Sequence, residues 1–112
     1  MDGKIVVVGS ALMKEDNAYY FTIARYLIDG GLDHSFGKNG IVLTKIGNLN
    51  SEANSVIIQS DGKIIAVGTT NTKEKNKNIA IVRYTKNGEL DTSFGVNGIN
   101  SVSIGTLDDY AY

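Results

Sequence analysis

The segment GELDTSFGVNGI at residues 88–99 repeats GGLDHSFGKNGI at residues 30–41. Two further pairs occur in the same order, because DGKIVVVGS at 2–10 returns as DGKIIAVGT at 61–69 and IARY at 23–26 returns as IVRY at 81–84. Self-similarity of this kind is the signature of a repeat architecture. The offset falls from 59 to 58 residues between Ser10 and Ile23. Since deletions are tolerated in surface loops, we expect a loop there in both copies.

Short aliphatic runs bounded by glycine predict strands rather than helices. No stretch keeps an apolar period of 3.6 residues over three turns. Two runs, 4–9 and 63–68, consist largely of Ile and Val, which predicts strands buried on both faces. The more polar runs 41–46 and 99–104 are typical of edge strands. Further strands are expected at residues 20–26, 53–59 and 79–84.

The turn signals complete the picture of a β-fold built from hairpins. Asp61 and Gly62 separate two apolar runs, which predicts a type I′ turn with positive φ at both central residues. The chain has 13 Gly and no Pro, as expected for tight turns between strands that all need their N–H groups. Four hairpin-connected strands form a propeller blade. The expected fold is therefore all-β, with two four-stranded antiparallel propeller-blade-like repeats forming a partial β-propeller.

The repeat boundaries follow from the same alignment. Residues 1–60 hold the first repeat unit, with three strands plus the first strand of the next unit. Residues 61–112 hold the second unit, which ends in a truncated strand where Ala111 aligns with Ala53. Two explanations remain open, a fragment of a longer tandem array or a protomer that closes a ring by self-association. We favour the fragment, because the last strand is cut short and repeat arrays generally need three or more units.

Three segments carry a family resemblance: QSDGKI at 59–64, AIVRY at 80–84 and NGELDTSFG at 87–95. They resemble the bacterial delta-60 repeat, with Ser60 where that family usually has Pro and His34 in place of a Thr. The resemblance implies a β-propeller in a large secreted or cell-surface bacterial protein, and hence an extracellular location. It implies no particular activity.

Composition excludes several classes of protein. The formal charge is −1 with a pI of about 5.7, so a nucleic-acid partner is not expected. The absence of Cys removes disulfides, thiolate nucleophiles and Cys-based zinc sites. No apolar run approaches membrane-spanning length. We expect no enzyme, because no nucleophile–base pair, metal cluster or phosphate loop is apparent.

Two arginines recur at the ends of apolar strands. Arg25 and Arg83 are followed eight residues later by Asp33 and Asp91. Because a half-buried guanidinium needs a partner, the spacing predicts an ion pair that ties each strand end to the following loop. The alternative is a ring of arginines that faces a channel and binds an anion.

The loop after each arginine repeats an aromatic residue. Phe36 and Phe94 occur at identical spacing, and we expect both to fix the loop on the sheet. The acidic residues of this loop imitate part of a calcium-binding spacing, but the full alternating series is missing and no metal or other cofactor is expected. His34 is expected to be an exposed loop residue.

Binding to a ligand is the runner-up function. Tyr19 and Tyr20 could stack on a sugar ring, so the speculative ligand-binding residues are these two tyrosines with Arg25 and Arg83. The favoured reading is a non-enzymatic structural or protein-interaction module. Its partners would be adjacent repeat units or identical chains. The alternative is a lectin-like propeller that binds a carbohydrate or another small ligand and closes its ring by homo-oligomerisation.

Overall fold

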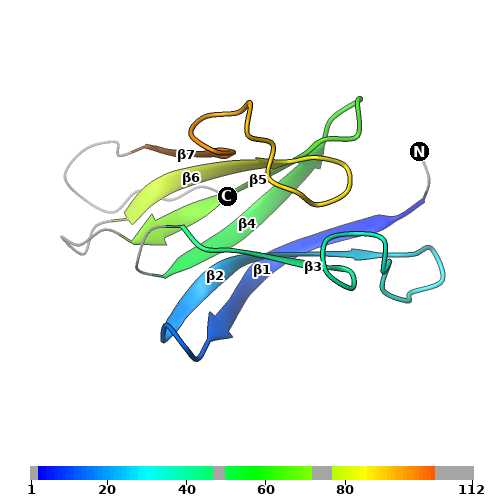
Figure 1. The fold of residues 1–112 in the computed structure, drawn as a ribbon, viewed down its shortest axis with the longest axis horizontal. Helices are drawn as coiled ribbons and strands as arrows, with labels where there is room; N and C mark the ends of the chain where they lie inside the picture. Colours follow the sequence, from blue (N-terminus) through cyan, green and yellow to red (C-terminus); the bar gives the residue numbers. More distant parts are fainter. Residues whose placement is uncertain (1–2, 47–49, 72–76, 103–112) are drawn as a thin grey trace.

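The computed structural model describes residues 3–46, 50–71 and 77–102, in which strands are the only regular elements. These strands form two antiparallel sheets, as the sequence predicts. Figure 1 shows the two sheets packed together, with β4 next to β1 and β2. The strands are β1 (Ile5–Met13), β2 (Ala18–Tyr26), β3 (Ile41–Thr44), β4 (Ser51–Ile58), β5 (Ile64–Asn71), β6 (Lys77–Tyr84) and β7 (Ile99–Val102).

The first sheet has the order β1-β2-β3 and the second the order β4-β5-β6-β7. Equivalent strands pair in equivalent registers, since Ile5 faces Tyr26 in the first sheet and Ile64 faces Tyr84 in the second. The strand before the second Asp-Gly turn, β4, joins the second sheet. The edge strands predicted at residues 41–46 and 99–104 correspond to β3 and β7, and each lies at an edge of its sheet.

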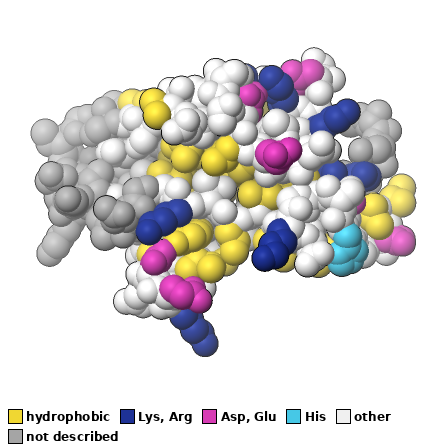
Figure 2. All heavy atoms as spheres, in the orientation of Figure 1, with side chains coloured by type: hydrophobic (Ala, Val, Ile, Leu, Met, Phe, Trp, Pro, Cys, Tyr) yellow, Lys and Arg dark blue, Asp and Glu magenta, His cyan; other side chains and the backbone are white. Residues whose placement is uncertain are grey.

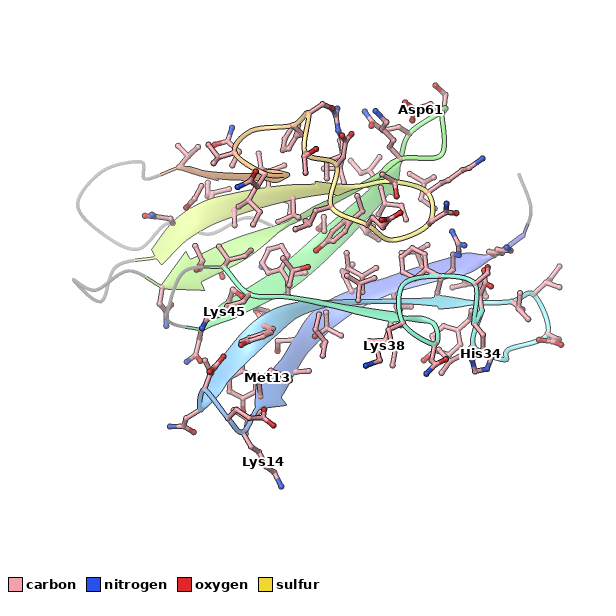
Figure 3. All side chains as sticks on the ribbon, viewed as in Figure 1. Met13, Lys14, His34, Lys38, Lys45 and Asp61 are labelled. Atoms are coloured by element: carbon pink, nitrogen blue, oxygen red, sulfur yellow. The ribbon has the colours of Figure 1, made fainter. Side chains whose placement is uncertain are left out.

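The loop expected between Ser10 and Ile23 lies at residues 14–17, in the hairpin between β1 and β2. Its counterpart in the second copy lies outside the described residues. Lys14 extends from the tip of the first hairpin (Figure 3).

The type I′ prediction at Asp61–Gly62 is wrong, although the hairpin itself is present. Gly62 has φ +88°, but Asp61 does not have a positive φ. The amide of Gly62 donates to the carbonyl of Gln59, which describes a turn closed by one left-handed glycine. The type I′ pattern occurs instead at Asn39–Gly40, where φ is +56° and +93°, and in its repeat at residues 97–98.

The hydrophobic core lies between the two sheets. The first sheet contributes Phe21 and Ile23, and the second contributes Ile64, Val82 and Tyr84, each at most 1% exposed. Burying one such side chain is worth about 1.5–3 kcal/mol. This contact therefore holds the two sheets together as adjacent blades.

The prediction that residues 4–9 are buried on both faces is wrong for the first copy. Val6 and Val8 pack against the core, whereas Ile5 and Val7 are 50% and 43% exposed. In the second copy the positions of Ile5 and Val7 are occupied by Ile64 and Ala66, which are 1% and 0% exposed. The difference arises because the first sheet covers this face of the second sheet, and no described residue covers the same face of the first.

Candidate functional site

The repeated loop after β2 is held by a charged cluster around Asp33. The Nε of Arg25 and the Nζ of Lys4 both lie 2.9 Å from Oδ2 of Asp33. The other carboxylate oxygen accepts from the Ser35 hydroxyl at 2.6 Å and from the Ser35 amide at 3.1 Å. The guanidinium also lies over the Phe36 ring, 4.4 Å from its centre. Asp33 is thereby buried and fully partnered.

The second copy reproduces this cluster around Asp91. Arg83 Nε and Lys63 Nζ lie 2.9 and 3.0 Å from Oδ2 of Asp91, and the Ser93 hydroxyl donates to Oδ1 at 2.6 Å. Arg83 lies 4.8 Å from the centre of the Phe94 ring. Both predicted Arg–Asp ion pairs are therefore present. The lysines are contacts that the sequence analysis does not predict, although both belong to the repeated Asp-Gly-Lys motif.

These contacts keep the two aspartates ionised, so that each one can pair with its arginine. The hydroxyl of Ser35 and the ammonium group of Lys4 hold the pKa of Asp33 well below its ordinary value, and Ser93 and Lys63 do the same for Asp91. Each arginine is therefore partnered by its own carboxylate. An anion would have to compete with that carboxylate, which disfavours the anion-binding alternative.

The blade seam, by which we mean the contact between the first and second sheets, uses atoms of the same loop. Nη1 of Arg25 donates to the carbonyl of Lys86 at 2.6 Å, and the amide of Gly37 donates to the carbonyl of Asn87 at 2.8 Å. Gly88 lies directly against this contact, because a Cβ there would be 2.9 Å from the Gly37 nitrogen. The seam is thus fixed by backbone groups as well as by apolar packing.

A buried hydroxyl pair also crosses the seam. Thr44 Oγ1 and Tyr84 Oη lie 2.5 Å apart, and Tyr84 is fully buried. Burial raises the pKa of Tyr84 to about 12, so its phenol stays protonated and forms a neutral hydrogen bond with the Thr44 hydroxyl. Sequence reasoning missed this pair because it is not repeated. The copy of Tyr84 is Tyr26, but the copy of Thr44 is Val102, which has no hydroxyl.

Each sheet has one face in the seam and one face without a described neighbour, and these are opposite faces. We call the face with Ile64, Ala66, Val82 and Tyr84 in the second sheet the A face, and the face with Phe21 and Ile23 in the first sheet the B face. In the seam, the A face of the second sheet covers the B face of the first. The free surfaces are therefore the A face of the first sheet and the B face of the second.

The free A face is apolar. It carries Ile5, Val7, Ile41 and Leu43, which are 50%, 43%, 38% and 43% exposed. On the free B face, Val102 is 40% exposed, whereas its copy Thr44 is buried in the seam. Hydrophobic side chains are visible over both sheets in Figure 2.

The two candidate tyrosines point to opposite sides of β2, because adjacent residues of a strand alternate. Tyr20 lies on the A face and donates a hydrogen bond to Asp16, which raises the pKa of Tyr20. Tyr19 lies on the B face and is 44% exposed. It lines a hollow of about 430 Å³ together with Glu52 and Asn71. The tyrosines therefore do not form one platform, and neither arginine lines this hollow.

Other candidates carry no site in the described part of the chain. Ranges 3–46, 50–71 and 77–102 contain no group of three or more His, Asp or Glu side chains placed to hold a metal ion. His34 is exposed in the loop between β2 and β3 (Figure 3). Among the described residues no helix has the length and apolarity needed to cross a membrane.

Comparison with known proteins agrees with the blade architecture. Neither the search of curated proteins nor the search of solved structures gave a significant match. Among protein families, a domain of unknown function described as a β-propeller, DUF5122, matches residues 2–36 and 59–94. These two segments cover more than half of the chain and coincide with the two repeats. The chain therefore belongs to the DUF5122 β-propeller family.

Proposed function

We propose that this chain is a non-enzymatic structural and protein-interaction module that packs against further propeller blades through its two free faces. The observation that carries the proposal is the relation between those faces. The free A face and the free B face are the two halves of the contact that the seam already makes. A neighbour of the same kind can therefore repeat the seam at either end.

The equivalent hydrogen-bonding groups support this arrangement. Arg83 is the copy of Arg25, and Ile28 occupies the position of Lys86, whose carbonyl accepts from Arg25 in the seam. Gly95 is likewise the copy of Gly37, whose amide donates across the seam. A repeated seam would bring Arg83 and Gly95 of one unit to the residue 28–29 turn of the next. It would lack the hydroxyl pair, since Val102 replaces Thr44.

The contact is head-to-tail, because different faces meet. Such an association forms a closed ring if its rotation closes and an open filament if it does not. We further propose a larger extracellular bacterial protein as the natural setting, by resemblance to the delta-60 repeat. The blades that cover the free faces would be adjacent units of that protein or identical chains.

Blocking one face at a time tests the proposal. Val7→Lys places a charge on the free A face, and Val102→Lys places one on the free B face. By native mass spectrometry and sedimentation velocity, we expect the unmodified chain to form multiples of 12.0 kDa as concentration rises, and each variant alone to remain a monomer. Mixing the two variants should give only a dimer, because one intact A face and one intact B face remain.

Val96→Lys is the matched control, since Val96 is 77% exposed in a loop outside both faces. It should associate as the unmodified chain does. A chain that stays monomeric at every concentration would refute stacking between identical chains. Variants that assemble without being mixed would refute stacking through these two faces.

A carbohydrate-binding role is the second candidate, and the Tyr19 hollow favours it. Every side chain that lines this hollow is polar, and Tyr19 supplies an exposed aromatic ring. Aromatic rings combined with hydroxyl, amide and carboxylate groups suit a sugar. A glycan array followed by calorimetric titration tests this role. Binding should be lost with Tyr19→Ala and kept with Tyr20→Ala, because Tyr20 lies on the other face of the strand.

A further inference from the structure

The outer edge of β1 differs from the same edge in the second copy. Strand β5, the copy of β1, is paired on both sides, with β4 and β6. Strand β1 is paired only with β2 in the described structure. It spans Ile5–Met13, and its nine residues contain neither a charged residue nor a proline. Edge strands normally carry such residues as protection against pairing with another chain.

Gly9 provides an independent observation at this edge. Its copy, Gly68, has no room for a side chain, because a Cβ there would overlap the carbonyl oxygen of Glu52 in β4. This close approach occurs at the bulge where β4 shifts register between Ala53 and Ser55. A Cβ on Gly9 would meet no described atom within 4 Å. Nor does Gly9 have a positive φ, so the described chain gives no reason for a glycine there.

We infer that the free edge of β1 is a docking site for an extended strand with the pattern of β4, bound antiparallel with its bulge over Gly9. The register follows from the repeat. In the second sheet Ala53 faces Gly68, Val56 faces Ala66 and Ile58 faces Ile64. The docked strand therefore places a small residue opposite Gly9 and aliphatic residues opposite Val7 and Ile5.

The surroundings suit such a strand. A hollow of about 190 Å³ lies on β1 and β2, and Val7, Gly9 and Ala24 are among its lining residues. Main-chain hydrogen bonds along the edge supply affinity, and the alternate side chains supply specificity, as in other complexes formed by strand addition. The aliphatic side chains of the docked strand would extend the free A face.

A synthetic peptide with the sequence of residues 50–60, NSEANSVIIQS, is the probe. Its fluorescein-labelled form is titrated with the full 112-residue chain, and binding is followed by fluorescence anisotropy. We expect saturable binding with one peptide per chain. A control peptide with Val56→Asp and Ile58→Asp should bind at least tenfold more weakly, because the docked aliphatic positions then carry charges.

Gly9→Ala is the decisive variant of the chain. It should keep the circular dichroism spectrum and the Tm of the unmodified chain, because its methyl group points into open space. It should nevertheless weaken peptide binding at least tenfold, because that methyl group meets the bulge of the docked strand. If the peptide instead displaced β4 from the second sheet, Gly9→Ala would bind it as the unmodified chain does, and the inference would be overturned.

This inference rests on the proposed function, because both take the chain to consist of propeller blades. The results of the two experiments can nevertheless be told apart. Head-to-tail association without peptide binding up to about 1 mM overturns the strand site and leaves face stacking intact. A Kd of about 1 mM corresponds to a binding free energy of only about 4 kcal/mol, so weaker binding would not support a docking site. Peptide binding by a chain that remains monomeric supports the strand site and contradicts stacking between identical chains.

Discussion

Gly88 and Gly30 are the same position of the two copies, and replacing each by Ala measures the blade seam directly. Both glycines have φ +95°, so the backbone strain of a new side chain is shared by the two variants. They differ in their surroundings. A Cβ at Gly30 meets nothing within 4 Å, whereas a Cβ at Gly88 lies 2.9 Å from the Gly37 nitrogen and 3.0 Å from a methyl carbon of Val42.

The magnitudes follow from these two contributions. A left-handed conformation costs a non-glycine residue about 1–2 kcal/mol, which is the loss expected for Gly30→Ala. Gly88→Ala suffers the same strain and must also displace backbone of the first sheet. Overpacking of this kind costs about 1–3 kcal/mol more. The free energy of unfolding should therefore fall about twice as far for Gly88→Ala as for Gly30→Ala.

Urea denaturation followed by circular dichroism measures both losses. The experiment is run at the lowest usable protein concentration, so that association between chains does not contribute. Equal losses for the two variants would refute the seam, because the only designed difference between them is contact with the first sheet. A larger loss for Gly30→Ala would contradict the whole assignment of faces.

Three more predictions concern the seam and the charged clusters. Phe36→Ala should lower the free energy of unfolding by about 3–5 kcal/mol, because the ring is fully buried, and Phe94→Ala should lower it roughly half as much, because its ring is half-buried. Equal losses of the two variants in urea denaturation would contradict this difference in burial. Tyr84→Phe should lower the free energy of unfolding by about 1–3 kcal/mol, because it leaves the Thr44 hydroxyl buried without its partner. Adding Thr44→Val should recover much of that loss, and strictly additive losses in a double-mutant cycle would argue against the pair. Asp33 has a lowered pKa in the folded chain, so its contribution to stability is complete above its unfolded pKa of about 4 and is lost as the pH falls toward the lower folded pKa. The Tm should therefore drop from pH 5 to pH 2, and it should drop less steeply in an Asp33→Asn variant. Identical Tm profiles for the two proteins would count against this cause.

The strands, their pairing and the two Arg–Asp ion pairs could be predicted from the sequence because each depends on local pattern. The aliphatic runs bounded by glycine form strands in both copies, β1 and β5, although the two copies are covered differently. The ion pair of Arg25 with Asp33 is also local, since a hairpin-like return of the chain brings residues eight apart together. A repeated pair at repeated spacing was sufficient to find it.

Burial could not be predicted in the same way, because it depends on what lies next to each sheet. Ile5 and Ile64 share a motif and a strand position, yet they are 50% and 1% exposed. No local property of the sequence separates them. The sides of the two tyrosines are a different case, since strand alternation alone places Tyr19 and Tyr20 on opposite faces and argues against a shared platform.

The duplication makes the chain its own control for what a neighbouring blade does. Tyr84 is fully buried in the seam, whereas its copy Tyr26 is half-buried; the side chain of Arg25 is 11% exposed in the seam, whereas that of Arg83 is 22% exposed. These differences do not all favour one copy: A-face residues are more buried in the second copy and B-face residues in the first. A generally looser copy could not produce that crossed pattern. It is the pattern of one directional contact made once, with a complementary half left over at each end, and this is why the two free faces are expected to bind each other rather than themselves.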